Sequence, residues 1–114
     1  MDMAAAAATI GETDGMKRAL AARAMLVEAK KKQREGERMM VYCEEAARQI
    51  TRERERAEQL PGMSAGDKRE LGQLVARLQE LTAWRVRVAE ATLSEAYAQE
   101  QAAEAEIHSL SVGQ

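Results

Sequence analysis

The residues of this chain that could do chemistry are few and far apart. The single histidine, His108, falls near the end of the chain, and the single cysteine, Cys43, falls within the apolar run MMVYC. A nucleophile–base pair or a zinc site needs several such side chains at fixed spacing, and the sequence has no such group. We therefore interpret Cys43 as a small buried hydrophobe and His108 as a solvated side chain. We expect a protein that is not an enzyme and that has no catalytic residue, metal or cofactor.

Two other patterns suggest phosphate or nucleic-acid binding, but each lacks residues that such a site requires. Gly62 and Gly66 stand two positions either side of Ser64, yet no Lys-Ser or Lys-Thr pair follows, as a phosphate loop requires. The basic run 30–32 has no aromatic or glycine pattern for base contact beside it. With 17 basic and 19 acidic residues, the net charge is −2. We interpret the run as a solvated helix face and expect no nucleic-acid partner.

The composition is typical of long helices rather than of a sheet. Only 3% of residues are aromatic, and alanine, glutamate, arginine and glutamine are abundant. No apolar run reaches 18 residues, so no membrane span is expected. The single cysteine excludes an intramolecular disulfide, and no secretory signal is recognisable, which together indicate a reducing compartment such as the cytoplasm.

The stretch QLPGMSAG is the strongest break in the helical pattern, because it holds the only proline of the chain and two of its seven glycines. We predict a helix over 14–59, a turn over 60–66 and a second helix over 67–108. Ser64 and Asp67 have the spacing of a capping box at the start of that second helix. Residues 1–13 are expected to form a disordered leader and residues 109–114 a frayed tail.

Each predicted helix carries an apolar or small-residue stripe with steps of three and four. The first stripe, which Gln33, Gly36 and Arg54 interrupt, comprises Ala19, Ala22, Leu26, Ala29, Met40, Cys43, Ala47, Ile50 and Ala57. The second comprises Leu71, Leu74, Leu78, Leu81, Trp84, Val88, Ala91, Ala98, Ala102 and Ala105. These stripes predict a tight core near the turn, with looser packing far from it. For Trp84 a seam position is favoured, and an exposed partner anchor is the alternative.

The stripes and the central turn predict an all-α fold, an antiparallel hairpin or elongated coiled-coil bundle of two long helices in one domain over 14–108. If Leu60 lies near Asp67, residues 16–38, which are mainly basic, lie beside residues 89–111, which hold glutamates and no lysine or arginine. Opposite charges would then set the register and orientation more than the stability.

In two respects the sequence is compatible with more than one architecture. Thr92 and Glu95 have capping-box spacing, so a break near 92–94 could separate a short third helix from the second. The apolar residues around Met39 and Tyr42 also exceed what one seam needs. A third helix, a second copy or another partner could cover this excess, and a thin hairpin often forms four helices as a homodimer.

Residues 16–33, MKRALAARAMLVEAKKKQ, resemble the first helix of tubulin-binding cofactor A. The positions that match are Lys17, Arg18, Met25, Lys31 and Gln33. After the turn, the match continues at Asp67, Lys68, Arg69, Leu74 and Val75, and further on at Glu90-Ala91. The chain departs from the family in its longer first helix, in the lack of a clear third helix and in the lack of a proline within the second helix.

This resemblance implies a cytoplasmic, cytoskeleton-associated chaperone. Such a protein would bind β-tubulin after its release from the chaperonin and pass it toward assembly of the αβ heterodimer, without a cofactor. Basic residues suit the acidic surface of tubulin. The candidate partner-binding residues that follow from it are Lys17, Arg18, Lys31, Arg34, Arg38, Lys68 and Arg69.

Composition also fits a second class of protein, the coiled-coil stalk or adaptor of a bacterial type III or flagellar export apparatus. Proteins of this class are likewise short, antiparallel and rich in alanine, glutamate and arginine. A helical nucleic-acid-associated protein is the third interpretation, and an enzyme is the least favoured.

Overall fold

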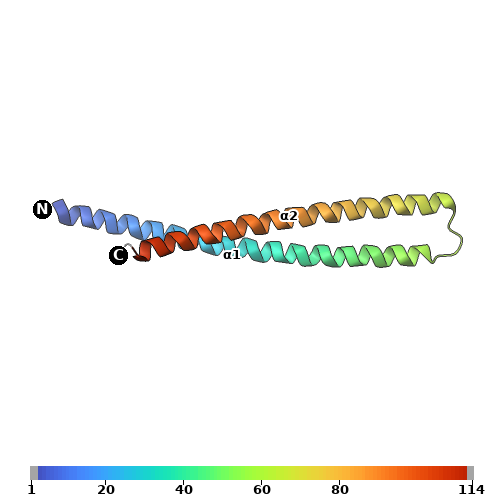
Figure 1. The fold of residues 1–114 in the computed structure, drawn as a ribbon, viewed down its shortest axis with the longest axis horizontal. Helices are drawn as coiled ribbons and strands as arrows, with labels where there is room; N and C mark the ends of the chain where they lie inside the picture. The colour runs from blue at the N-terminus through green and yellow to red at the C-terminus, as the bar shows by residue number, and fades with distance from the viewer. Residues whose placement is uncertain (1–2, 113–114) are drawn as a thin grey trace. The chain divides into compact units, whose positions relative to one another are not determined.

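The fold is all-α, a hairpin of two long helices, as the sequence predicts. The computed structural model describes residues 3–112, with helix α1 over Met3–Glu58 and helix α2 over Ala65–Val112 (Figure 1). Each helix contributes to two compact units. Unit 1 comprises Met1–Arg34 and Ser94–Gln114, and unit 2 comprises Glu35–Leu93, which includes the turn.

The turn has the local geometry that its sequence predicts. The amide of Leu60 donates to the carbonyl oxygen of Ala57 at 3.2 Å, which tightens the last turn of α1. Gly62 has a φ of 82°, a left-handed conformation that glycine adopts without steric cost. The Ser64 hydroxyl accepts from the Asp67 amide at 3.0 Å, and the Asp67 carboxylate accepts from the Ser64 amide at 3.3 Å. This reciprocal pair is the predicted capping box, and it starts α2.

The outer ends of the helices differ from the sequence-based boundaries. Helix α1 begins at Met3, so the described residues 3–13 belong to the helix, and residues 1–2 of the expected leader lie outside the described part. Alanine has the highest helix propensity, and extending an existing helix avoids the cost of nucleation. Helix α2 likewise continues to Val112 rather than ending at 108.

Helix α2 also runs without a break through residues 92–94, so the described residues form no separate third helix. The hydroxyl of Thr92 donates to the carbonyl oxygen of Val88, four residues earlier, at 2.9 Å. Its side chain therefore bonds within the helix instead of capping a new one.

Small residues at intervals of seven form the seam of unit 1. Ala22 and Ala29 of α1 are buried, as are Ala96 and Ala103 of α2. Each pair is spaced by one heptad, which keeps a residue on the same side of a helix along its length. Because alanine is short, the two helix backbones can approach closely along this seam.

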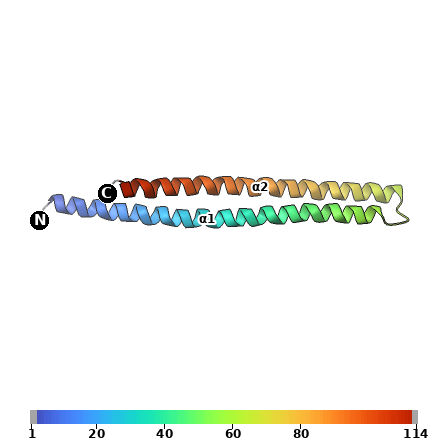
Figure 2. The same cartoon turned by 60° about the horizontal axis from the view of Figure 1, so that its bottom comes forward.

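Unit 2 continues the heptad series on both helices with different residues. Gly36 and Cys43 are buried on α1, and Val75 and Ala89 are buried on α2. Two views show the α1 and α2 segments of this unit side by side (Figure 1, Figure 2). The predicted stripe of the first helix is thus confirmed at Ala22, Ala29 and Cys43 as the side that meets α2.

The predicted stripe of the second helix is wrong. Leu74, Leu78 and Leu81 are 55%, 40% and 43% exposed, and Trp84 is 54% exposed, so the expected leucine core near the turn does not form. Most buried residues of α2 are instead the heptad alanines at 89, 96 and 103, one row around the helix from the leucines. In unit 1 the buried residues of both helices are alanines, which allow a close approach of the two backbones.

The predicted charge register is confirmed within unit 1. Arg18 Nη2 lies 2.6 Å from Glu106 Oε1, and Lys32 Nζ lies 3.9 Å from Glu95 Oε1. Gln33, which interrupts the apolar stripe, donates to the carboxylate of Glu100. A basic segment of α1 therefore lies antiparallel to an acidic segment of α2.

Over the residues that the structure describes, neither helix holds a stretch long and apolar enough to cross a lipid bilayer.

Candidate protein-binding surfaces

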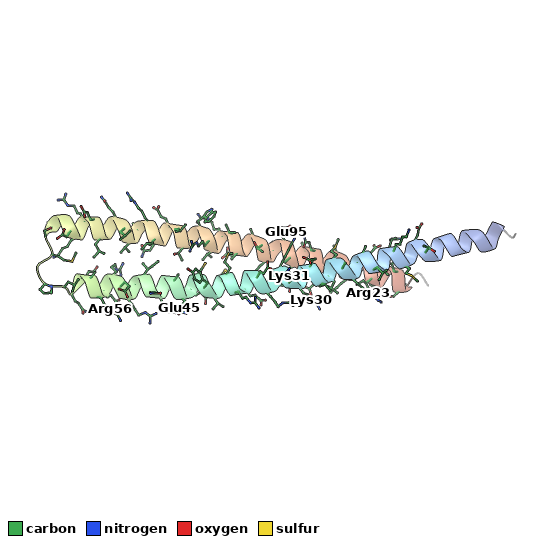
Figure 3. The ribbon with its side chains drawn as sticks, turned by 180° about the vertical axis from the view of Figure 1, so that it is seen from behind. Arg23, Lys30, Lys31, Glu45, Arg56 and Glu95 are labelled. Carbon is green, nitrogen blue, oxygen red and sulfur yellow. The ribbon has the colours of Figure 1, made fainter. Side chains whose placement is uncertain are left out.

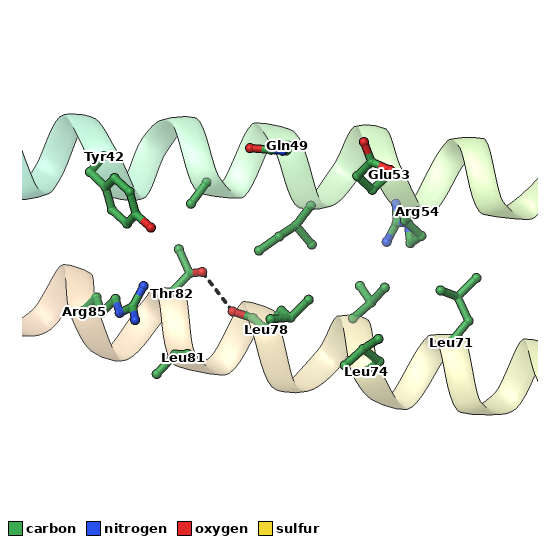
Figure 4. A pocket seen from close by; sticks show the side chains of 13 residues that line it. Tyr42, Gln49, Glu53, Arg54, Leu71, Leu74, Leu78, Leu81, Thr82 and Arg85 are labelled. Atoms are coloured by element: carbon green, nitrogen blue, oxygen red, sulfur yellow. Dashed lines mark hydrogen bonds between the residues drawn. The ribbon is translucent and has the colours of Figure 1, made fainter.

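An open apolar groove runs along one side of unit 2, between α1 and α2. Its volume is about 370 Å³ (Figure 4). We call this side the leucine face and define it by six lining residues: Tyr42, Ala46 and Gln49 of α1, and Leu74, Leu78 and Leu81 of α2. These residues lie on the flank of each helix, beside the buried seam.

The two walls of this groove differ in the size of their side chains. Along α2 the leucines form a high ridge, whereas the α1 wall holds the large Tyr42 and Ile50 and is low only between them, at Ala46 and Gln49. Figure 4 shows Gln49 across from Leu78 and Tyr42 across from Arg85. The groove therefore lies between the leucine ridge of α2 and an α1 wall with a low section at Ala46 and Gln49, and it has charged side chains toward its ends.

Aromatic side chains stand close to the leucine face. Tyr42 is 61% exposed, and Trp84, one helical turn beyond Leu81, is also exposed. Solvent-exposed aromatic and leucine side chains in one region are typical of protein interaction sites. For Trp84, the seam position favoured from the sequence is wrong, and a role as a partner anchor stays a prediction.

A second groove of unit 2 involves Cys43. Its lining combines apolar residues, such as Ile50 and Val86, with alanines and the hydroxyls of Thr51 and Thr82, and its volume is about 450 Å³. Cys43 itself is only 1% exposed and forms no disulfide, which confirms its interpretation as a small buried hydrophobe.

The seven predicted partner-binding residues are all exposed, and they are divided between the two units. Unit 1 holds Lys17, Arg18, Lys31 and Arg34, and unit 2 holds Arg38, Lys68 and Arg69. Within unit 2, Arg38 lies twenty residues before the end of α1, roughly 30 Å along the helix from the turn that Lys68 and Arg69 adjoin.

The basic residues of unit 1 differ in whether α2 neutralises them. Arg18 and Lys32 contact glutamates of α2, whereas Lys31 and Arg34 form no ion pair within the described part of the chain. Figure 3 shows Arg23, Lys30 and Lys31 along α1, with Glu95 on α2. Part of the positive charge of α1 thus remains available to an acidic partner.

An exposed charge cluster lies on the α1 segment of unit 2. Glu45 accepts from Arg48 at 2.9 Å and from Arg52 at 2.9 Å. The hydrogen bond from Arg48, with its positive charge and the weaker effect of Arg52, holds the pKa of Glu45 below its usual value. These contacts hold the side chains of Glu45, Arg48 and Arg52 together on the exposed side of α1.

The described residues contain no group of three or more histidine, cysteine, aspartate or glutamate side chains placed to hold a metal ion. His108 is exposed on α2.

Sequence reasoning identifies the parts of the leucine face without placing them. Helical spacing predicts that the leucines of α2 pack in the seam. It does not predict where the additional apolar residues around Met39 and Tyr42 lie. Seam residues can be told from residues of the leucine face by the heptad series of small residues at Ala89, Ala96 and Ala103. This series occupies the seam, so the leucines lie outside it.

Comparison with family models, with curated protein sequences and with solved structures finds no match to this chain. The class that the structure defines is a helical hairpin with an alanine-rich seam.

Proposed function

We propose that this protein is a non-catalytic chaperone that binds an acidic protein client through exposed basic side chains of α1. The observation that carries the proposal is that Lys31, Arg34 and Arg38 are exposed and have no ion-pair partner in the described chain, although α2 offers several glutamates. Cations that the fold does not neutralise attract an acidic surface and accelerate its association.

We further propose that the client is β-tubulin, captured after release from the chaperonin and passed toward heterodimer assembly. Support comes from the sequence resemblance at Lys17, Arg18 and Lys31 in the first helix and at Lys68 and Arg69 after the turn. A chaperone of this kind needs an extended, exposed helical surface and no active site. Cytoplasm and cytoskeleton are the locations that this function implies.

The test is capture of purified β-tubulin by the immobilised full chain at low and moderate salt. Because the basic residues belong to two units, Lys31→Glu with Arg34→Glu is one variant and Arg38→Glu is another. Each is expected to weaken capture by about tenfold, because an attraction between a cation and an acidic surface becomes a repulsion.

The matched control reverses Arg77 and Arg87, two exposed arginines of α2 without an ion-pair partner in the described chain, and it should leave capture unchanged. Equal capture by all variants would remove the basic residues from the site. Failure of the unmodified chain to bind tubulin would reject the client, and binding to a hexameric export ATPase instead would favour the stalk class.

A further inference from the structure

The leucine face and the tubulin proposal concern different surfaces. The basic residues Lys31, Arg34 and Arg38 do not line the groove of unit 2, whose apolar wall is formed by Leu74, Leu78 and Leu81. The proposed client site therefore leaves the leucine face unexplained. We propose that this face is a dimer interface, and that a second copy of this chain covers it.

The exposed apolar side chains of the face supply a large part of the area that a dimer requires. The exposed fractions of Tyr42, Leu74, Leu78 and Leu81 run from 40% to 61%. With roughly 200 Å² for each fully exposed side chain, these four contribute on the order of 400 Å². A stable interface buries roughly 600–1,000 Å² on each partner, so these side chains supply about half of one side.

The shape of the face suits its own copy. A two-fold dimer places the same surface on both subunits, so the surface must be complementary to itself. Here the leucine ridge of α2 lies beside the low section of α1 at Ala46 and Gln49, between Tyr42 and Ile50. A two-fold rotation can set leucines of each copy against the low section of the other. Four helices would then surround one apolar core, as in a four-helix bundle.

The charges of the face do not oppose this pairing. Glu53 and Arg54 line the groove near the turn, and Arg85 lines its other end. Side chains of both signs are present, and the centre of the groove carries none. The face therefore lacks the strong single-sign charge that would select an acidic or a basic partner or repel an identical copy.

The narrow seam explains why a second layer is needed. Among the described residues, Cys43 is the largest side chain that the fold buries completely, and the other buried residues are mostly alanines. Each alanine removes little apolar surface from water, so the seam alone stabilises the hairpin weakly. Burial of the leucines between two copies supplies the larger hydrophobic contribution.

Sedimentation equilibrium and light scattering of the full chain test the inference between about 1 and 100 μM. A dimer should show twice the chain mass of 12.6 kDa. Its midpoint of thermal unfolding should also rise with protein concentration, because association stabilises only the folded chain. A monomer mass across the whole range, with an unfolding midpoint independent of concentration, would overturn the inference.

Variants locate the interface. Leu78→Glu places a charge on the leucine ridge of α2 and Ala46→Glu on the low section of α1, and each should weaken dimerisation at least about a hundredfold. Val41→Glu is the matched control, because Val41 is 63% exposed on α1 and lines neither of the two large grooves. Circular dichroism verifies that each variant remains helical. A dimer that tolerates both face substitutions, or that only Val41→Glu disrupts, would overturn the assignment.

Discussion

Gly36 of α1 lies directly against Leu93 of α2. A methyl group added to Gly36 would stand 2.8 Å from both Cγ and Cδ2 of Leu93. Carbon atoms do not approach that closely without displacement of one of them, so the leucine fills the space that a glycine leaves open. Glycine therefore has a packing role here, despite its low helix propensity.

Gly36→Ala should consequently not stabilise the protein. Alanine gains about 1 kcal/mol of helix propensity over glycine, but overpacking against Leu93 costs about 1–3 kcal/mol. Gly72→Ala is the control, because a methyl group added at Gly72 would meet nothing within 4 Å, and it should gain about 1 kcal/mol. Urea unfolding measures both free energies. An equal gain at the two glycines would show that Leu93 does not occupy the space beside Gly36.

The capping box at the turn predicts a loss of stability for Ser64→Ala. The hydroxyl of Ser64 satisfies the amide of Asp67, and its removal should cost about 1 kcal/mol in urea unfolding. Ser94→Ala, an exposed change within α2, should be neutral or slightly stabilising, because alanine is the better helix former. If Ser64→Ala were as stable as Ser94→Ala, the cap would contribute nothing.

The fold was predictable because its signals are local. Pro61, Gly62 and the pair Ser64–Asp67 determine where one helix ends and the next begins, and these features act within a few residues. The stripe of α1 was also predictable, since apolar and small residues there occupy mainly one side. Along α1 one helical period therefore predicts one face, and this is the face that packs against α2.

The seam of α2 was not predictable in the same way. Leucines at 74, 78 and 81 and alanines at 89, 96 and 103 both have helical spacing, and hydrophobicity alone favours the leucines. The choice depends on the partner helix, and in unit 1 the buried Ala22 and Ala29 of α1 pack with the buried Ala96 and Ala103 of α2. That information is non-local, so the leucine face became visible only in three dimensions.

The titration of Glu45 is expected to depend on Arg48. The folded pKa of Glu45 lies below its usual value of 4.5, chiefly because Arg48 donates a hydrogen bond to its carboxylate. Its stabilising effect is therefore present above the unfolded pKa and lost as the pH falls through the folded pKa. Carbon-detected NMR titration should show the midpoint of Glu45 rising in Arg48→Gln. Arg52→Gln should raise it less, and an unchanged midpoint in Arg48→Gln would contradict the assignment.

Arg54 occupies a position in the apolar stripe of α1, and its substitution should stabilise the protein. The Nε atom of Arg54 is buried without a hydrogen-bond partner, and Glu58 lies 3.8 Å away without forming a hydrogen bond to it. An unsatisfied buried donor costs about 1–3 kcal/mol, so Arg54→Met, which replaces the side chain as far as Nε with apolar atoms, should raise the free energy of unfolding by about 1 kcal/mol. Arg23→Met, at an exposed position of α1, is the control and should change it by less than about 0.5 kcal/mol. A loss of stability in Arg54→Met would mean that the guanidinium stabilises the turn-proximal end of the hairpin, and that the contact with Glu58 outweighs the buried donor.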